Sequence, residues 1–153
     1  MATFKRMSLL AVIVGAMVVV GCGGLDFGDD DDDNNGDNGV TRDQALVGTW
    51  QLDSATINGQ TATIAEGMDA ANPAVDGATF TFAADGHWTT TEYVGQDLDC
   101  THAGTWTSSG GAFTVTFFAD QDQDTMLYQI TGNQMTCTFV ESGNTIVLTL
   151  TRQ

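Results

Sequence analysis

Two-residue alternation between apolar residues and threonine runs through most of the chain and strongly limits how it can fold. Residues 112–117 read Ala-Phe-Thr-Val-Thr-Phe, and residues 145–151 read Thr-Ile-Val-Leu-Thr-Leu-Thr. Successive side chains of a β-strand point to opposite faces, so each such segment presents one apolar face and one threonine-rich face. From Thr41 onward, 22 of 113 residues are Thr and one is Pro, a composition typical of β-sheet.

Segments with this period, separated by turn signals, predict eight strands. They are Leu46–Asp53, Ala78–Ala83, His87–Val94, Thr101–Thr107, Ala112–Phe118, Thr125–Thr131, Gln134–Val140 and Asn144–Thr151. Short connections such as Asp85-Gly86 and Ser142-Gly143 are typical of hairpins. We therefore expect an all-β fold, an eight-stranded antiparallel up-and-down barrel, since closure removes exposed strand edges. A two-sheet sandwich is the alternative.

The N-terminal residues have the pattern of an export signal. Lys5 and Arg6 precede Ser8–Val20, thirteen small or apolar residues without a charge. A membrane-spanning helix needs about 20 such residues, so this run has the length of a secretory signal rather than of a span.

Val19-Val20-Gly21-Cys22 resembles the lipobox of bacterial lipoproteins. The resemblance implies that residues 1–21 are a lipoprotein signal peptide, cleaved after Gly21. It also implies that Cys22 carries diacylglycerol and an acylated (palmitate-type) α-amine, a stable membrane anchor. Gly23, being other than Asp, implies the outer membrane or cell surface of a bacterium. An ordinary signal peptide or an uncleaved anchor is the alternative.

Residues 22–40 form an acidic segment between this signal and the threonine-rich part. Seven Asp lie between Asp26 and Asp37, with Gly and Asn among them, so we expect an extended, disordered tether to a domain at 41–153. Asp31-x-Asp33-x-Asn35-Gly36 matches the opening of a calcium loop. Arg42 stands where that loop needs a bidentate Glu, so diffuse attraction of cations is the favoured interpretation.

The charge balance excludes several partners. The chain has 20 acidic residues against four Lys and Arg, too few cations to neutralise nucleic-acid phosphates. It equally argues against adsorption through positive charge to anionic lipid. We expect a monomer without a cofactor.

Three cysteines are present, and lipidation of Cys22 would leave an even pair. In an oxidising compartment we expect Cys100 and Cys137 to form a disulfide, with two free buried thiols as the alternative. A zinc site is not indicated, because the pair lacks CxxC spacing and His87 and His102 do not complete a ligand set.

The domain also resembles the lipocalin and lipocalin-like group over Ala45–Arg152. Leu46-Val-Gly48-Thr49-Trp50 is similar to its first-strand Gly-x-Trp signature, and Gly104-Thr105-Trp106 to a mid-domain copy. The resemblance implies that Trp50 closes the barrel floor under Arg152, with a guanidinium stacked on an indole. The domain is short for a lipocalin and lacks the helix expected between the seventh and eighth strands.

The first function hypothesis is binding of a small apolar ligand in the barrel, with Phe80, Phe82, Trp88 and Tyr128 of the expected interior as candidate contacts. An eight-stranded barrel is wide enough for one small ligand, or is filled by its own side chains. The connection Ile57–Gly77, about twenty residues long, is a candidate lid, with a short helix possible within Thr61–Ala71. The alternative function is a protein-binding module with a filled core, such as an envelope enzyme inhibitor or an adhesion factor.

Catalysis finds little support, because no nucleophile motif and no Lys beyond the signal peptide is present. His87 is expected on the outer face, while His102 shares the parity of Trp106 and is expected to be partly buried. Glu92 shares the parity of Trp88 and points inward or lies beyond the barrel rim, the position we favour. Asp120, Asp122 and Asp124 are interpreted as a solvated turn.

Overall fold

The computed structural model describes residues 42–153, in which nine strands and one short helix follow one another. The predicted signal peptide, Cys22 and the predicted tether lie outside the described residues. The strands are β1 (Gly48–Ile57), β2 (Gln60–Ala62), β3 (Gly77–Phe82), β4 (His87–Val94), β5 (Asp97–Ser109), β6 (Ala112–Phe117), β7 (Gln123–Thr131), β8 (Gln134–Glu141) and β9 (Asn144–Arg152). The helix is α1 (Ile64–Met68).

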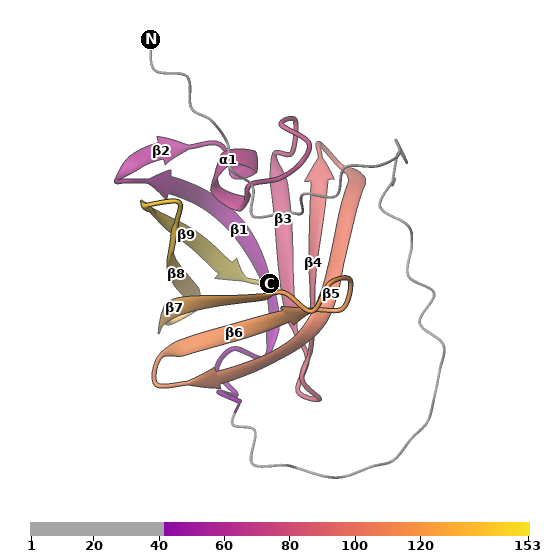
Figure 1. Cartoon of the computed structure of the whole chain (residues 1–153), viewed down its shortest axis with the longest axis vertical. Coiled ribbons are helices and arrows are strands. Elements are labelled where there is room, and N and C mark those ends of the chain that lie inside the picture. Colours follow the sequence, from indigo (N-terminus) through magenta and orange to yellow (C-terminus); the bar gives the residue numbers. More distant parts are fainter. Residues whose placement is uncertain (1–41) are drawn as a thin grey trace.

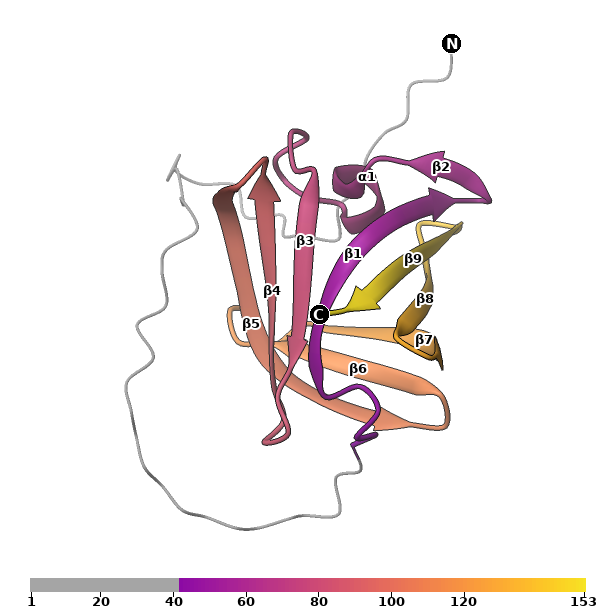
Figure 2. The same cartoon turned by 180° about the vertical axis from the view of Figure 1, so that it is seen from behind.

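Eight of these strands close into an antiparallel up-and-down barrel (Figures 1 and 2). From β3 to β9 each strand pairs with the next, β1 pairs with β3, and β9 returns to pair with β1 from Trp50↔Arg152 to Ile57↔Ile146. The predicted barrel is therefore confirmed, and a sandwich is excluded by the β1–β9 pairing. Each of the eight predicted segments is a barrel strand.

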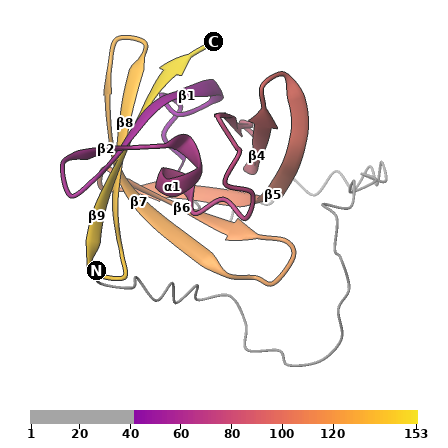
Figure 3. The ribbon, with the colours of Figure 1, turned by 90° about the horizontal axis from the view of Figure 1, so that it is seen from above.

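The long connection between β1 and β3 contains two short elements (Figure 3). β2 forms a hairpin with β1, and α1 follows with Thr63 as its N-cap. Thr63 Oγ1 accepts from the Glu66 amide, while Glu66 Oε2 accepts from the Thr63 amide, a reciprocal capping box. The short helix expected in this region is thus present. We call the end of the barrel at which α1 lies the α1 end, and the opposite end, where β1 begins and β9 finishes, the floor end.

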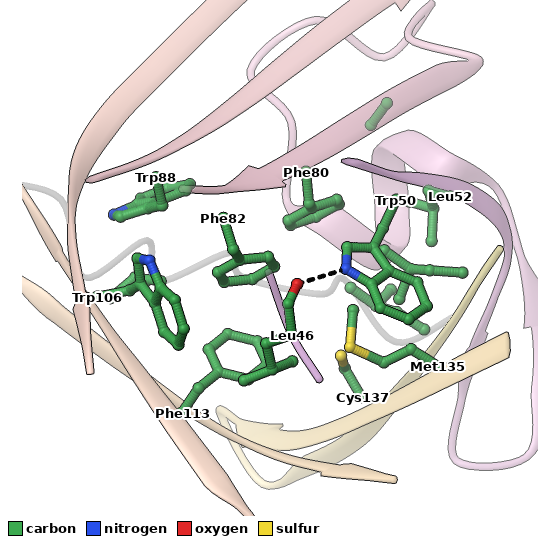
Figure 4. Packing of buried hydrophobic residues seen from close by; sticks show 14 of the residues in the cluster. Leu46, Trp50, Leu52, Phe80, Phe82, Trp88, Trp106, Phe113, Met135 and Cys137 are labelled. Atoms are coloured by element: carbon green, nitrogen blue, oxygen red, sulfur yellow. Dashed lines mark hydrogen bonds between the residues drawn. The ribbon is translucent and has the colours of Figure 1, made fainter. Parts of the chain in front are cut away.

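The floor end is filled by a core that the threonine alternation builds (Figure 4). The apolar face of each strand turns inward, and the largest fully buried side chains include Trp50, Trp106, Phe82 and Phe113. Phe82 meets Trp106 and Phe113 edge-to-face, with ring centroids 5.3 and 5.2 Å apart. Such contacts stabilise a core beyond the area that the rings bury.

No helix within residues 42–153 is long and apolar enough to cross a membrane.

Candidate functional site

Trp50 and Arg152 lie together at the floor end. The guanidinium carbon of Arg152 is 4.3 Å from the centroid of the Trp50 ring, and Trp50 Nε1 donates to the Leu46 carbonyl at 2.8 Å. Arg152 also donates to the carbonyls of Val47 (2.7 Å) and Ala45. The cation therefore stacks on the indole and fastens the segment that enters β1.

Gly48 leaves the space that this arrangement needs. Its φ is +134°, and a Cβ placed there would lie 2.9 Å from Arg152 Nη1. A larger residue would strain the backbone and push the guanidinium away. This is the physical reason for a glycine two positions before Trp50.

On β6 and β8, the inner face of the barrel changes from fully buried near the floor end to half-buried near the α1 end. On β6 the inward Phe113 is 2% exposed, whereas Phe117 near the other end of the strand is only half-buried. On β8 Met135 is 1% exposed, while Phe139 is half-buried in the same way. The inward apolar side chains of these two strands are therefore sealed towards the floor end and half-buried towards the α1 end, whereas Ile146 of β9 is only 4% exposed at the α1 end.

Three inward polar side chains stand at the α1 end, on β4 and β5. Glu92 is 5% exposed and Thr90 3%, so both point into the barrel. Thr90 lies opposite His102 across the β4–β5 pairing, and Glu92 opposite Cys100. His102 Nε2 is 3.4 Å from Glu92 Oε1 and 3.6 Å from Cys100 Sγ. The expectation that Glu92 lies beyond the rim is wrong, because the side chain is buried beside His102.

Hydrogen bonding to Glu92 raises the pKa of His102 above its usual value, against the opposing effect of burial. The carboxylate thus favours the charged imidazolium. Two buried polar atoms in this wall, Trp88 Nε1 and Thr90 Oγ1, have no hydrogen-bond partner among the described residues. Buried polar groups are nearly always paired, so each marks a place where an acceptor or donor is missing.

Two further carboxylates, Asp124 of β7 and Glu141 of β8, lie on the opposite wall of the α1 end. The hydrogen-bonded pairing of β7 with β8 stops at Leu127↔Thr138, so both lie beyond its last pair. Burial, and then the charges of Asp122 and Asp120, raise the pKa of Asp124. Burial, and then the charges of Asp69 and Asp124, raise the pKa of Glu141. We call Asp69, Asp124 and Glu141 the mouth acids.

The four predicted ligand contacts are distributed over both halves of the barrel. Phe82 belongs to the filled floor core, at 1% exposed. Phe80 and Trp88 lie deeper than the polar groups, and Trp88 meets Phe117 edge-to-face at 5.2 Å. Phe80 and Trp88 thus form the bottom of the accessible inner face. Tyr128 is not part of it.

Tyr128 points instead to a polar depression of about 420 Å³ on the floor-end surface. Its hydroxyl donates to Asp43 Oδ2 at 2.6 Å. Burial and this hydrogen bond raise the pKa of Tyr128 to about 12, and the same bond lowers the pKa of Asp43. The depression is lined by Arg42, Asp43, Ser108, Ser109, Gly110, Gly111 and Tyr128.

Trp88 is accommodated by the second Gly-x-Trp sequence. A Cβ on Gly104 would lie 2.7 Å from Trp88 Nε1 and 1.9 Å from the Thr116 carbonyl oxygen. Gly104 pairs directly with Trp88 across β4 and β5, so the glycine lets the indole lie flat on the neighbouring strand. Trp106 itself donates from Nε1 to the Ala83 carbonyl at 3.0 Å.

The expected disulfide between Cys100 and Cys137 is corrected by the structure, in which Cys137 is free and buried. Cys137 lies on β8 opposite Leu148, whereas Cys100 lies on β5 with β6 and β7 between the two strands. Adjacent strands are about 4.8 Å apart, so three such steps exceed the roughly 7 Å between Cα atoms that a disulfide can bridge. Two side chains that both point into a barrel are not close to each other when their strands are several positions apart.

The structure also places the histidine of β4 and the aspartates around the start of β7. His87 is exposed on the outer face, with Nδ1 3.1 Å from Asp85 Oδ2. Asp120 and Asp122 lie in the turn between β6 and β7, but Asp124 is the second residue of β7 and shares the inward parity of Met126. No group of three His, Cys, Asp or Glu side chains within residues 42–153 is arranged to hold a metal ion.

With this geometry in place, the comparison with known families is direct. The profile of the lipocalin-like domain matches residues 46–137, more than half of the chain. The chain belongs to the lipocalin-like domain family. The matched region runs from the residue that accepts the Trp50 hydrogen bond to the buried Cys137.

Two solved structures show a similar chain trace at low sequence identity. The wild-type fluorescent protein UnaG has a TM-score of 0.44 and 14% identity, covering 71% of this chain and 98% of that one. As-p18, an extracellular fatty acid binding protein, has a TM-score of 0.44 and 16% identity, covering 74% and 99%. A search of curated protein sequences returned no significant match.

Sequence reasoning missed Thr90, Asp124 and Glu141 as inner-face groups. The predicted strands began at Thr125 and ended at Val140, one residue short of each carboxylate. Continuing the two-residue period from Met126 and Phe139 would have placed both acids on the inner face.

Proposed function

We propose that this lipocalin-like protein is anchored by lipid to a bacterial cell envelope and binds one small, mostly apolar molecule in the α1 end of its barrel. The observation that supports the binding role most strongly lies on β6 and β8. There the inward Phe117 and Phe139 are half-buried towards the α1 end, while Phe113 and Met135 are sealed towards the floor end. A pocket with an apolar wall and a few convergent polar groups is the usual form of a small-molecule site.

The elements around the α1 end support entry from that side. Gly67 of α1 packs so closely on β1 that an added Cβ would be 2.3 Å from the Ala55 Cβ. The segment after α1 is tied to the β4–β5 hairpin by Asn72 Nδ2, which donates to Asp99 Oδ1 at 2.8 Å. The Gly95 amide likewise donates to Asp76 Oδ1 at 2.8 Å. This cover is held by α1 and by loop hydrogen bonds, so opening it breaks no pairing between the barrel strands.

Native mass spectrometry of the protein, purified without detergent, tests the binding role. We expect a fraction of the molecules to carry one co-purified small molecule, which is released on unfolding. Titration with dodecanol, an uncharged apolar probe, should then show one binding site and quench the fluorescence of Trp88. A protein that is ligand-free and takes up no dodecanol would leave only the filled-core alternative.

The anchor rests on the lipobox-like sequence alone, because Cys22 lies outside the described residues. We expect Cys22→Ser to release the protein from membranes or to leave an uncleaved precursor. Partitioning into detergent by this variant, equal to that of the wild type, would contradict lipidation. The proposed location at the outer membrane or cell surface is tested by protease accessibility on whole cells.

A protein-binding role remains the second candidate because of the outer surface of β7 and β8. Leu127 is 61% exposed and Val140 71%. Leu127 faces Thr138, so Val140 is its diagonal neighbour on the outer face, within reach of one apolar partner side chain. Leu127→Ser with Val140→Ser should abolish such an interaction and leave ligand binding unchanged.

A further inference from the structure

The charges at the α1 end are almost entirely negative. Glu92 is buried in one wall, Asp124 and Glu141 lie at the rim of the other, and Asp69 is the C-cap of α1. Burial, and then the charges of neighbouring aspartates, raise the pKa values of Asp124 and Glu141, so these carboxylates carry unfavourable interactions in the absence of a cation. His102 is the one basic side chain beside Glu92 in the described inner face, and it is partly exposed.

Cations are found at the other end of the barrel, where they are already engaged. Arg42 and Arg152 are the only Lys or Arg of residues 42–153. Arg42 Nε donates to the Trp106 carbonyl at 3.3 Å, and Arg152 is held over Trp50. A fatty acid entering at the α1 end would therefore meet no Lys or Arg to pair with its carboxylate, and would be repelled by the mouth acids.

The unpaired hydroxyl of Thr90 is independent evidence for a bound ligand. Thr90 is 3% exposed, lies two residues before Glu92 on the same inward face, and its Oγ1 has no hydrogen-bond partner. A hydroxyl buried without a partner costs free energy unless a bound group pairs with it. A donor placed between Thr90 and Glu92 would satisfy both the hydroxyl oxygen and the carboxylate.

We propose that the barrel selects a cationic amphiphile, an alkyl- or arylamine, whose ammonium group donates to Glu92 and Thr90. Its apolar body would lie against Phe80, Phe117 and Phe139 of the inner face. The mouth acids attract the cation from solution, and binding relieves their repulsion. This inference rests on the proposed binding function and specifies the chemical class of the ligand.

Isothermal titration of the purified protein with three twelve-carbon probes tests the selection at concentrations below micelle formation. Dodecylamine, dodecanol and dodecanoate differ only in the charge of the head group. We expect dodecylamine to bind about tenfold or more tightly than dodecanol, as for a hydrogen bond to a charged group, and dodecanoate to bind more weakly than dodecanol.

Two substitutions should change the amine affinity in opposite directions. Glu92→Gln should weaken dodecylamine binding about tenfold and leave dodecanol binding unchanged. His102→Gln should strengthen dodecylamine binding, because it removes the imidazole that competes for Glu92. Asp53→Asn is the matched control, since it removes one exposed carboxylate of β1 and should leave both affinities unchanged.

The outcomes separate the two proposals. Binding of dodecanol without a preference for the amine, or a preference for dodecanoate, overturns the inference and keeps the binding function. An equal effect of Asp53→Asn and Glu92→Gln also overturns it, because the preference would then reflect net charge alone. If none of the three probes binds, the proposed function itself fails.

Discussion

Arg152 concentrates several interactions in one side chain. It lies 4.3 Å over Trp50, donates to two carbonyls of the segment before β1, and occupies the space that Gly48 leaves. Its own backbone amide donates to the Asn133 carbonyl at 2.8 Å. The last strand, the first strand and the turn before β8 are therefore fastened at one point, which explains why the floor end is the sealed end.

A double-mutant cycle at Trp50 and Arg152 measures this fastening. Trp50→Ala should cost about 3–5 kcal/mol of unfolding free energy, the usual range for emptying a buried aromatic site. Arg152→Ala should cost about 1–3 kcal/mol through lost stacking and lost charge-assisted hydrogen bonds. The losses should be non-additive by at least about 0.5 kcal/mol in urea denaturation, because each change removes the other's partner.

Trp106 is the control for that cycle. Trp106 is as buried as Trp50, and its Nε1 donates to the Ala83 carbonyl. The Arg152 guanidinium stacks on Trp50 and not on Trp106. Trp106→Ala and Arg152→Ala should therefore add. Additive losses for Trp50 and Arg152 as well would show that the stacking contributes nothing.

The buried thiol of Cys137 should be protected from alkylation. Burial raises the pKa of its thiol to about 12, so almost no reactive thiolate is present at pH 8. Iodoacetamide should leave Cys137 unmodified in the native protein and label it in urea, as read by mass spectrometry of its peptide. Rapid labelling in native buffer would show that the floor half is not closed as described.

The stability of α1 comes from its close packing on β1 and not from its length. A helix of five residues is too short to be stable alone, and the capping box together with packing on β1 and β9 holds it. Gly67 permits this packing, since an added Cβ would lie 2.3 Å from the Ala55 Cβ.

Gly67→Ala should therefore displace α1 and open the cover of the α1 end. We expect a loss of about 1–3 kcal/mol in stability, as for an overpacked contact, and faster hydrogen exchange of the α1 amides. Gly77→Ala is the matched control, because its nearest neighbour would be Tyr93 Cβ at an ordinary 3.8 Å. Equal exchange in the two variants would mean that α1 does not depend on Gly67.

Periodicity predicted all eight barrel strands because alternation is a local property of the chain. The orientation of Glu92 was not accessible in the same way. The β4–β5 register shifts between Glu92 and Tyr93, so where the inward face ends depends on pairing with a strand that begins at Asp97. The cysteine pairing failed for a related reason, since the distance between β5 and β8 is set by closure of the whole barrel. The Thr63-x-x-Glu66 capping box was readable and would have placed α1 more closely.

At the scale of the whole molecule, charge is separated along the barrel. Both arginines of residues 42–153 lie at the floor end, while Glu92 and the mouth acids lie at the α1 end. Asp43 and Asp85 at the floor end have lowered pKa values, because hydrogen bonds stabilise their charged forms. Asp124 and Glu141 have raised ones. The charged forms of Asp43 and Asp85 thus favour the fold, and those of Asp124 and Glu141 oppose it, as expected where a site is kept ready for a ligand.

The pair of His102 and Glu92 makes stability depend on pH near neutrality. The pKa of His102 is raised in the folded state. Its contribution to stability is therefore fully present below the pKa of the unfolded state, about 6.5, and is lost as pH rises through the pKa of the folded state. The expected loss is only roughly a few tenths of a kcal/mol, since His102 is 43% exposed and water screens the pair. Urea midpoints between pH 6 and 9 should fall more for the wild type than for His102→Gln. His87→Gln, which removes the exposed histidine beside Asp85, should behave as the wild type. If His102→Gln retained the full dependence on pH, a group other than His102 would be responsible for it.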